Sequence, residues 1–211
     1  MDTVPRLLLV SPPFDQADAA EVLGSALAAV GAAAGGADIA ALLLRGGSLD
    51  EDTFARRIAA PLQAAQAAGI AVLLEDRPAL LAASGADGLH LGLSDKGPRL
   101  RDLRPRLGDG VILGAGCGAS RHLAMTAGED GADYVAFGGI EGPEADGEIL
   151  AWWQAVMTPP QVAFGAGDLA AVARLAAAGA DFVAAAPALW AAGGDPGAAL
   201  AALQAALADR S

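Results

Sequence analysis

The sequence contains little cysteine, few aromatic residues and few positive charges. A single cysteine, Cys117, occurs among 211 residues, which excludes an intrachain disulfide. Aromatic residues amount to 4%, against 54% hydrophobic residues in all, so small aliphatic side chains are expected to dominate the core. Only 13 basic residues face 25 acidic ones, giving a net charge of −12. Because that charge repels phosphate backbones and anionic lipid, nucleic acid and membrane are excluded as expected partners.

Long hydrophobic runs are also missing. Gly, Asp or Arg interrupts the apolar stretches about every ten residues, which leaves no segment long enough to cross a membrane. The opening residues, Met1 to Arg6, carry an acid and lead directly into a strand-like run, unlike a cleavable signal. We therefore expect a cytoplasmic protein.

The most regular feature of the sequence is a repeated Gly-Ala-Asp tripeptide. Each copy follows an alanine-rich helical segment and precedes an apolar run. The aspartates are spaced by 49, 46 and 48 positions, at Asp38, Asp87, Asp133 and Asp181. Glycine supplies the left-handed conformation that ends a helix, and aspartate bonds to backbone amides where a strand begins. The period fits two β/α units, and we expect all four aspartates on one rim of a barrel.

Short apolar segments alternate with helical ones between the copies. The expected strands are Arg6–Val10, Asp38–Leu44, Ile70–Leu74, Gly88–Gly92, Val111–Ala115, Tyr134–Gly138, Gln161–Gly165 and Phe182–Ala186. The expected helices are Ala17–Ala34, Glu51–Ala68, Ala79–Ser84, Pro98–Leu107, Ser120–Glu129, Glu148–Met157, Asp168–Ala178 and Ala198–Ala208. These units predict an α/β fold, a single (β/α)8 TIM barrel over residues 1–211. The alternative, an open doubly wound sheet, lacks its Gly-x-Gly-x-x-Gly turn after the first strand.

Charged residues gather where the expected strands end, and in such barrels that rim carries the functional groups. Asp76 and Asp95 leave adjacent strands, and converging carboxylates are suited to Mg2+ with a bound phosphate. Arg45 and Arg77 are placed to bind that phosphate. The alternative is a ring of solvated charges with local Asp–Arg pairs.

A second phosphate site is expected after strands seven and eight. Gly165, Gly167 and Ala188 lie where barrels commonly bind phosphate through backbone amides and a helix N-terminus. The glycines equally fit plain turns, and Pro187 removes one amide that such a site would use.

Three segments of the chain also match a known family. Glu75–Arg77, Ala86–Asp95 and Gly131–Ile140 resemble the Asn-Asp-Arg, Ala-Asp-Gly-Val-His-Leu-Gly-Gln-x-Asp and Gly-Ala-Asp-Tyr-Val-Gly-x-Gly-Pro-Ile segments of thiamine phosphate synthases and TenI proteins. The similarity runs in order from Arg6 to Ala192. These synthases join a pyrimidine pyrophosphate to a thiazole phosphate and release pyrophosphate.

The resemblance assigns roles to the residues at the strand ends. It implies that Asp76 and Asp95 bind Mg2+, and that Arg45 and Arg77 bind pyrophosphate. The glycines after strand seven would hold the thiazole phosphate. The implied ligand is a phosphorylated small molecule. A homodimer is kept as a candidate assembly, which the sequence itself does not fix.

Several polar residues of the family pattern are absent. The family's Gln-Leu-Arg-x-Lys falls on Leu43–Gly47, without the Gln and the Lys, and Glu75 and Leu93 replace an Asn and a Gln. Gly114–Ala119 has neither the Ser nor the His of Gly-x-Ser-x-His, and Glu141–Asp146 lacks the Thr-x-x-Lys pattern. The resemblance therefore implies weak or lost condensation activity. It also implies that the thiazole tautomerase activity of the TenI branch is lost, because that activity depends on the strand-five His.

Two hypotheses of function follow from this comparison. The first is a slow transferase of thiamine biosynthesis. The second is a catalytically degenerate barrel that binds or senses a phosphate ligand, or an enzyme for another phosphorylated small molecule. His90, inside a strand, and Cys117, at a strand end, are expected to be interior groups rather than a base and a nucleophile.

Overall fold

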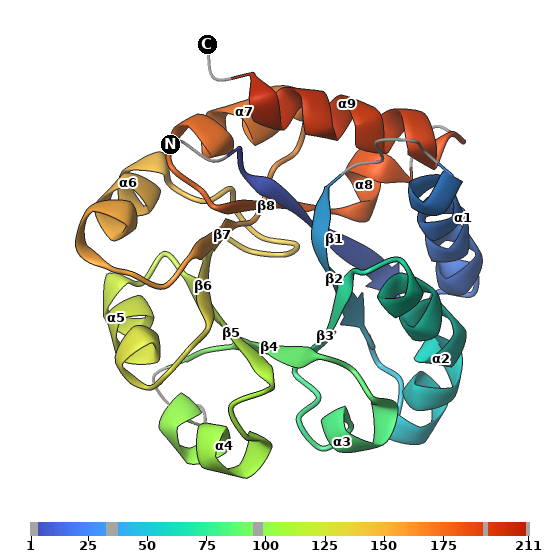
Figure 1. Ribbon diagram of the computed structural model, residues 1–211. Helices are drawn as coiled ribbons and strands as arrows, with labels where there is room; N and C mark the ends of the chain where they lie inside the picture. The colour runs from blue at the N-terminus through green and yellow to red at the C-terminus, as the bar shows by residue number, and fades with distance from the viewer. Residues whose placement is uncertain (1–3, 33–37, 95–98, 192–193, 210–211) are drawn as a thin grey trace.

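The computed structural model describes residues 4–32, 38–94, 99–191 and 194–209, in which eight parallel strands close into a barrel (Figure 1). Each strand pairs with its neighbours in sequence, and β1 also pairs with β8. The strands are β1 (Arg6–Pro13), β2 (Ile39–Arg45), β3 (Ala71–Glu75), β4 (Gly88–Gly92), β5 (Ile112–Gly118), β6 (Tyr134–Phe137), β7 (Gln161–Ala163) and β8 (Phe182–Ala185). The closed order confirms the predicted barrel and excludes the open sheet.

Helices follow the strands and form an outer ring around them (Figure 1). They are α1 (Ala19–Ala32), α2 (Glu51–Ala67), α3 (Leu81–Ser84), α4 (Leu100–Leu107), α5 (Arg121–Glu129), α6 (Gly147–Val156), α7 (Leu169–Ala177), α8 (Pro187–Trp190) and α9 (Pro196–Ala208). The short α8 is an element that the sequence analysis missed. Pro187 at its first position favours a helix start, because proline's fixed φ suits it and its missing N–H costs nothing there.

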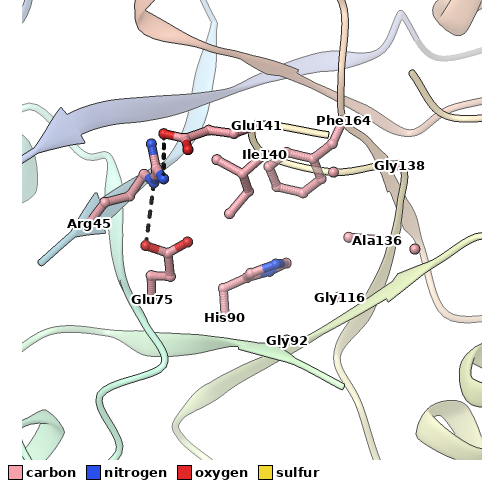
Figure 2. Close-up of a pocket in the computed structure, with 12 residues that line it drawn as sticks. Arg45, Glu75, His90, Gly92, Gly116, Ala136, Gly138, Ile140, Glu141 and Phe164 are labelled. Carbon is pink, nitrogen blue, oxygen red and sulfur yellow. Dashed lines mark hydrogen bonds and ion pairs between the residues drawn. The ribbon is translucent and has the colours of Figure 1, made fainter. Parts of the chain in front are cut away.

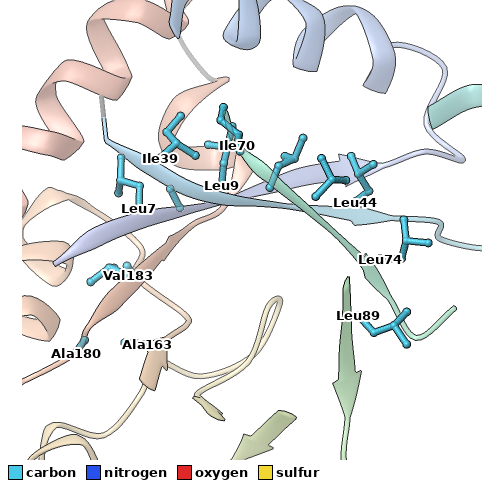
Figure 3. Packing of buried hydrophobic residues seen from close by; sticks show 14 of the residues in the cluster. Leu7, Leu9, Ile39, Leu44, Ile70, Leu74, Leu89, Ala163, Ala180 and Val183 are labelled. Atoms are coloured by element: carbon cyan, nitrogen blue, oxygen red, sulfur yellow. The ribbon is translucent and has the colours of Figure 1, made fainter. Parts of the chain in front are cut away.

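The strands are buried on both faces, which explains their nearly continuous apolar sequences. Along β1, Leu7 and Leu9 point outward to the helices, whereas Leu8 and Val10 point into the barrel. Figure 3 shows the outward layer, in which aliphatic side chains of several strands lie between sheet and helices. The inward layer consists of Leu8, Val10, Leu43, Leu73, Tyr134, Ala136, Val162, Phe164 and Ala184.

The aspartates of the Gly-Ala-Asp repeat link neighbouring strands through hydrogen bonds at the rim where the strands begin. Asp87, Asp133 and Asp181 lie directly before β4, β6 and β8. Each carboxylate accepts a backbone N–H near the start of the preceding strand, at 2.7, 2.7 and 2.8 Å respectively. Asp38, before β2, pairs with the Arg6 side chain at the start of β1, with 2.8 Å between Oδ1 and Nε. The four aspartates therefore share one rim, as predicted, and each serves a pair of strands.

The glycines of the tripeptide end helices in the left-handed conformation, also as predicted. Gly85, Gly131 and Gly179 have φ angles of 75°, 90° and 101°. The first copy's Gly36 lies outside the described residues.

Three strand boundaries were predicted wrongly. Strand β1 runs to Pro13 rather than Val10, because Pro13 still pairs with Arg45 of β2. Strand β5 runs to Gly118 rather than Ala115, because Gly116 and Gly118 continue the pairing with β4 and β6. Cys117 therefore lies within a strand and is 3% exposed, which confirms it as an interior residue. Strand β7 is shorter than predicted and ends at Ala163.

Candidate active site at the barrel mouth

A cavity of about 320 Å3 opens at the rim where the strands end (Figure 2). Side chains and backbone from β2 to β7 and the segments after them surround it. The lining consists of Arg45, Glu75, His90, Gly92, Gly116, Gly118, Ala136, Gly138, Gly139, Ile140, Glu141 and Phe164. The many glycines keep the space open: a Cβ at Gly116 would lie 3.0 Å from Nε2 of His90.

His90 is the polar group at the base of this cavity. It is 4% exposed, and its Nδ1 lies 2.8 Å from the hydroxyl of Tyr134 inside the barrel. Its ring packs against Phe164, with 5.3 Å between centroids. Burial lowers the pKa of His90 to about 4 and raises the pKa of Tyr134, so both are neutral at pH 7.

The hydrogen bond between these two groups decides the tautomer of the imidazole. Tyr134 is buried in an apolar interior, and no other acceptor for its hydroxyl occurs among the described residues. An unpaired buried O–H is costly, so the hydroxyl donates to Nδ1. The ring proton is then on Nε2 of His90, beside Gly116.

Arg45 is the cation of the cavity, and carboxylates hold it on two sides. Its Nε lies 3.3 Å from Oε2 of Glu75, and its Nη2 lies 2.9 Å from Oε1 of Glu141. The Arg45 side chain is 12% exposed, and its backbone N–H donates to the buried Ser11 hydroxyl at 3.0 Å. Burial raises the pKa of Glu75, an effect that the Arg45 charge partly offsets. The guanidinium is thus fixed in place and largely neutralised by its own chain.

Glu141 reaches Arg45 because the β6–α6 loop, residues 138–146, bends over the mouth (Figure 1). Gly138 has a φ of 81°, and its N–H donates to the carbonyl of Gly118 at 3.0 Å. The Ala145 N–H donates to the Phe164 carbonyl at 2.9 Å, which ties the loop to the end of β7. A side chain at Gly138 would collide with that carbonyl, at 2.6 Å from an added Cβ.

Asp76, a predicted metal ligand, lies at the edge of this cavity. Its Oδ1 accepts the backbone N–H of Gly92, a lining residue, at 2.9 Å. Asp76 is also the one non-glycine residue of the described chain with a positive φ, 49°. The other predicted ligand, Asp95, lies outside the described residues.

Arg77, a predicted pyrophosphate ligand, is turned away from the cavity. Its Nη2 donates to the carbonyl of Gly47 at 3.0 Å, and its guanidinium lies over the Phe54 ring at 5.8 Å. Of the two predicted arginines, Arg45 lines the cavity, whereas Arg77 stabilises the β2–α2 loop through its hydrogen bond to Gly47.

The predicted phosphate residues lie at the same rim, beyond Phe164. Gly165 has a φ of 87° and packs under Glu144 of the β6–α6 loop, since an added Cβ would lie 2.5 Å from the Glu144 Cα. Gly167 is exposed, and, its two chain neighbours aside, no atom of the described residues lies within 4 Å of its added Cβ. Ala188 is exposed in the first turn of α8. None of the three belongs to the cavity lining of the described chain.

Sequence analysis missed Glu141, Ile140 and Phe164 as lining residues. Glu141 stood out there as part of a loop without the family's Thr and Lys, and nothing in a loop sequence says where a side chain points. The one available signal was the Gly138-Gly139 pair, which allows the tight bend that carries Glu141 over the mouth.

Known proteins with the same features were found by comparison of sequence and of structure. A sequence model described as thiamine monophosphate synthase matches residues 7–189. The chain belongs to this family. A thiamine-phosphate synthase of Rhodospirillum centenum is 42% identical over 168 residues, covering 76% of this chain and 77% of the relative. One from Hyphomonas neptunium is 39% identical over 186 residues, covering 82% and 80%. The family resemblance inferred from the sequence is thereby confirmed.

Solved structures extend the likeness to the fold. Thiamine phosphate pyrophosphorylase from Pyrococcus furiosus superposes with a TM-score of 0.79 at 21% identity, covering 96% of this chain and 95% of the other. A geranylgeranylglyceryl phosphate synthase from Thermoplasma acidophilum gives 0.66 at 15% identity, covering 96% and 93%. In the described part of this chain, no helix is long and apolar enough to cross a membrane.

Proposed function

We propose that the barrel mouth binds a phosphorylated small molecule as a thiamine phosphate synthase-like site, and that its condensation activity is weak or lost. Arg45 carries this proposal. It is the lining cation on the position that the family uses for pyrophosphate, yet Glu75 and Glu141 already occupy its guanidinium. The Arg45 guanidinium can therefore contact a bound phosphate group. Little uncompensated positive charge is left to stabilise the transition state of the condensation.

Charge on the leaving group is the reason to expect weak condensation. Pyrophosphate departs with two or more negative charges, which grow on it in the transition state. The family meets them with Mg2+, arginines and two lysines, but Gly47 and the acidic Glu141–Asp146 segment stand at the lysine positions. The one lysine of the chain, Lys96, is at neither position. Each missing donor costs roughly a hundredfold in rate.

Mg2+ fits this proposal through Asp76 and Asp95. The backbone of Asp76 holds a strained left-handed conformation at the cavity edge, and one of its oxygens, Oδ2, has no hydrogen-bond partner within the described residues. Backbone strain of this kind clusters at binding and active sites. Bound there, the ion would neutralise phosphate charge, and Asp76 would orient it through a carboxylate that the Gly92 N–H already fixes.

The second phosphate of the family reaction is proposed to lie at Gly165, Gly167 and Ala188. Gly167 supports this because the space beside it is open, and Ala188 because it is exposed in the first turn of α8. Gly165 contributes mainly by letting the β6–α6 loop pack closely.

Turnover of the two family substrates tests the proposed activity. With the pyrimidine pyrophosphate, the thiazole phosphate and excess Mg2+, we expect a rate more than tenfold below the ~10 per second median of enzymes. The Arg45→Gln variant serves as the control, and it should abolish any residual turnover. A wild-type rate within about tenfold of that median would contradict the argument from missing cations.

A binding or regulatory barrel of the same descent is the second candidate function. The segment Gly114–Ala119, at the end of β5, favours it, since its lining residues Gly116 and Gly118 offer the cavity glycine backbone in place of the family's Ser and His. Thermal stabilisation by pyrophosphate without turnover, and failure to rescue a strain lacking the synthase, would distinguish this function from a slow enzyme.

A cytoplasmic location and a homodimer are also part of the proposal.

A further inference from the structure

The ion pair between Arg45 and Glu141 spans the barrel mouth. Arg45 ends β2, and Glu141 follows β6, which is the opposite strand in a closed ring of eight. The two side chains meet at 2.9 Å between Nη2 and Oε1, above the cavity that both of them line (Figure 2).

The two carboxylates that hold Arg45 are not equivalent. The Glu75 side chain is 23% exposed and contacts Nε from the neighbouring strand, so it belongs to the wall. The Glu141 side chain is 70% exposed and stands on a loop, so moving it away requires little desolvation or repacking. Glu141 is therefore the partner that an incoming anion would displace from the guanidinium.

The charges that line the cavity make this displacement unfavourable for anions. Arg45 is the one positive side chain of the described lining, Glu75 and Glu141 are acidic, and His90 is neutral. A phosphate group that approaches Arg45 meets a carboxylate already in place and is repelled by it at short range.

We propose that Glu141 is a specificity-determining residue that acts as an internal counter-anion for Arg45. It occupies the guanidinium face that a phosphate group would use, and so it sets the affinity of the mouth for anionic ligands. This inference rests on the proposed function, namely that a phosphate-bearing ligand binds at Arg45. It predicts that the anion affinity rises when the Glu141 charge is removed.

The chain offers a matched control in the same loop. Glu144 pairs with Arg174 of α7, with both carboxylate oxygens 3.1 Å from Nη2, and it does not line the cavity. Glu144→Gln removes one negative charge from the same loop without touching Arg45. Glu141→Gln removes the charge at the mouth and keeps a side chain of similar size on an exposed position.

Calorimetric titration with inorganic pyrophosphate at low ionic strength tests the inference. The proteins are wild type, Glu141→Gln, Glu144→Gln and Arg45→Gln, each checked for folding by its thermal melting curve. We expect Glu141→Gln to bind pyrophosphate about fivefold more tightly than wild type or better, Glu144→Gln to stay within about twofold, and Arg45→Gln to bind weakest. The gain of Glu141→Gln should shrink as salt is added.

Each other outcome contradicts the inference in a distinguishable way. If Arg45→Gln weakens binding but Glu141→Gln matches wild type, the proposed site stands and the role of Glu141 is wrong. If Glu141→Gln and Glu144→Gln bind pyrophosphate more tightly by the same factor, the effect is one of net charge and the assigned contact is wrong. If no protein binds pyrophosphate, the proposed function and this inference both fail.

Discussion

At the residue scale, the barrel interior changes the chemistry of two potentially reactive groups. Burial raises the pKa of Cys117 to about 12, so its thiol stays protonated and inert at neutral pH. Burial lowers the pKa of His90 to about 4, so the imidazole is neutral at pH 7, and its Nδ1 lies 2.8 Å from the Tyr134 hydroxyl. Neither group is suited to nucleophilic or general-base catalysis at pH 7, whereas the Nε2–H of His90 is suited to orient a ligand.

The pKa of His90 predicts how stability depends on pH. Between about pH 6.5 and pH 4 the unfolded chain carries a proton on His90 that the folded chain excludes, so the free energy of unfolding falls as the pH falls. The loss amounts to at most about 1.4 kcal/mol per pH unit. Urea unfolding at several pH values in this window measures it.

The variant His90→Gln is the control for this prediction. Glutamine keeps a hydrogen-bond acceptor for the Tyr134 hydroxyl but does not titrate, so the slope across the window should flatten. Equal slopes for both proteins would show that His90 is not the group responsible.

At the element scale, the β6–α6 loop gives the mouth its shape. Its backbone bonds to the ends of β5 and β7, and its close approach depends on glycines at Gly138 and Gly165. The loop carries Ile140 and Glu141 into the cavity lining. A change that lifts this loop should therefore affect both the stability of the fold and the contact with Arg45.

The substitution Gly165→Ala should lift the loop and destabilise the protein. Its φ of 87° is unfavourable for alanine, and the added Cβ would lie 2.5 Å from backbone atoms of Pro143 and Glu144. We expect a loss of about 2 kcal/mol or more in the free energy of unfolding. Denaturant unfolding at pH 7 measures this loss.

Gly167→Ala is the matched control on the same segment. Among the described residues other than its two chain neighbours, no atom lies within 4 Å of its added Cβ, so the free energy of unfolding should change by less than about 0.5 kcal/mol. Similar losses for the two variants would mean that loop packing does not depend on Gly165.

At the scale of the whole molecule, the Gly-Ala-Asp repeat reflects how the barrel closes. The carboxylates of Asp87, Asp133 and Asp181 join strands in the pairs β3–β4, β5–β6 and β7–β8, and Asp38 joins β1 to β2. The repeat therefore has a period of two β/α units because each aspartate serves two strands.

Two substitutions in equivalent copies should differ in their cost. Asp133→Ala leaves the N–H of the buried residue Leu113 unpaired and removes a partner of Arg104, so we expect a loss of about 1–3 kcal/mol in the free energy of unfolding. Asp38→Ala breaks a pair with Arg6 in which both side chains are about half exposed, and should cost about 0–1 kcal/mol. Thermal or urea unfolding compares them, and an equal cost would show that the backbone hydrogen bond contributes nothing extra.

Much of the fold was predictable because its signals are local. Apolar runs such as that of β4, predicted and found at Gly88–Gly92, follow from burial on both faces of a parallel strand. The four-residue helix α8 was missed because a single turn has too short a pattern to be recognised. The end of β5 was misplaced because glycines carry no hydrophobic signal, although their backbone continues the pairing.

The candidate site was predictable only in part. Arg45 was identified as a lining cation because it ends a strand, and every strand of such a barrel ends at the same rim. Arg77 lies two residues after the next strand, β3, yet a side chain of that length has several partners within reach, and the Gly47 carbonyl and the Phe54 ring hold it. Position along a strand predicts the rim on which a residue lies, but not the direction of a long side chain.

The chain alone therefore specifies the eight β/α units, their closure and the family to which the protein belongs, because propensity, periodicity and turn chemistry are properties of neighbouring residues. Whether Arg45 is available to a phosphate group is decided by the tertiary structure. Its partner Glu141 comes from the opposite side of the ring, and the contact exists only once the barrel has closed and the β6–α6 loop has folded over the mouth. Electrostatic neutralisation depends on distance in space, which local sequence does not encode.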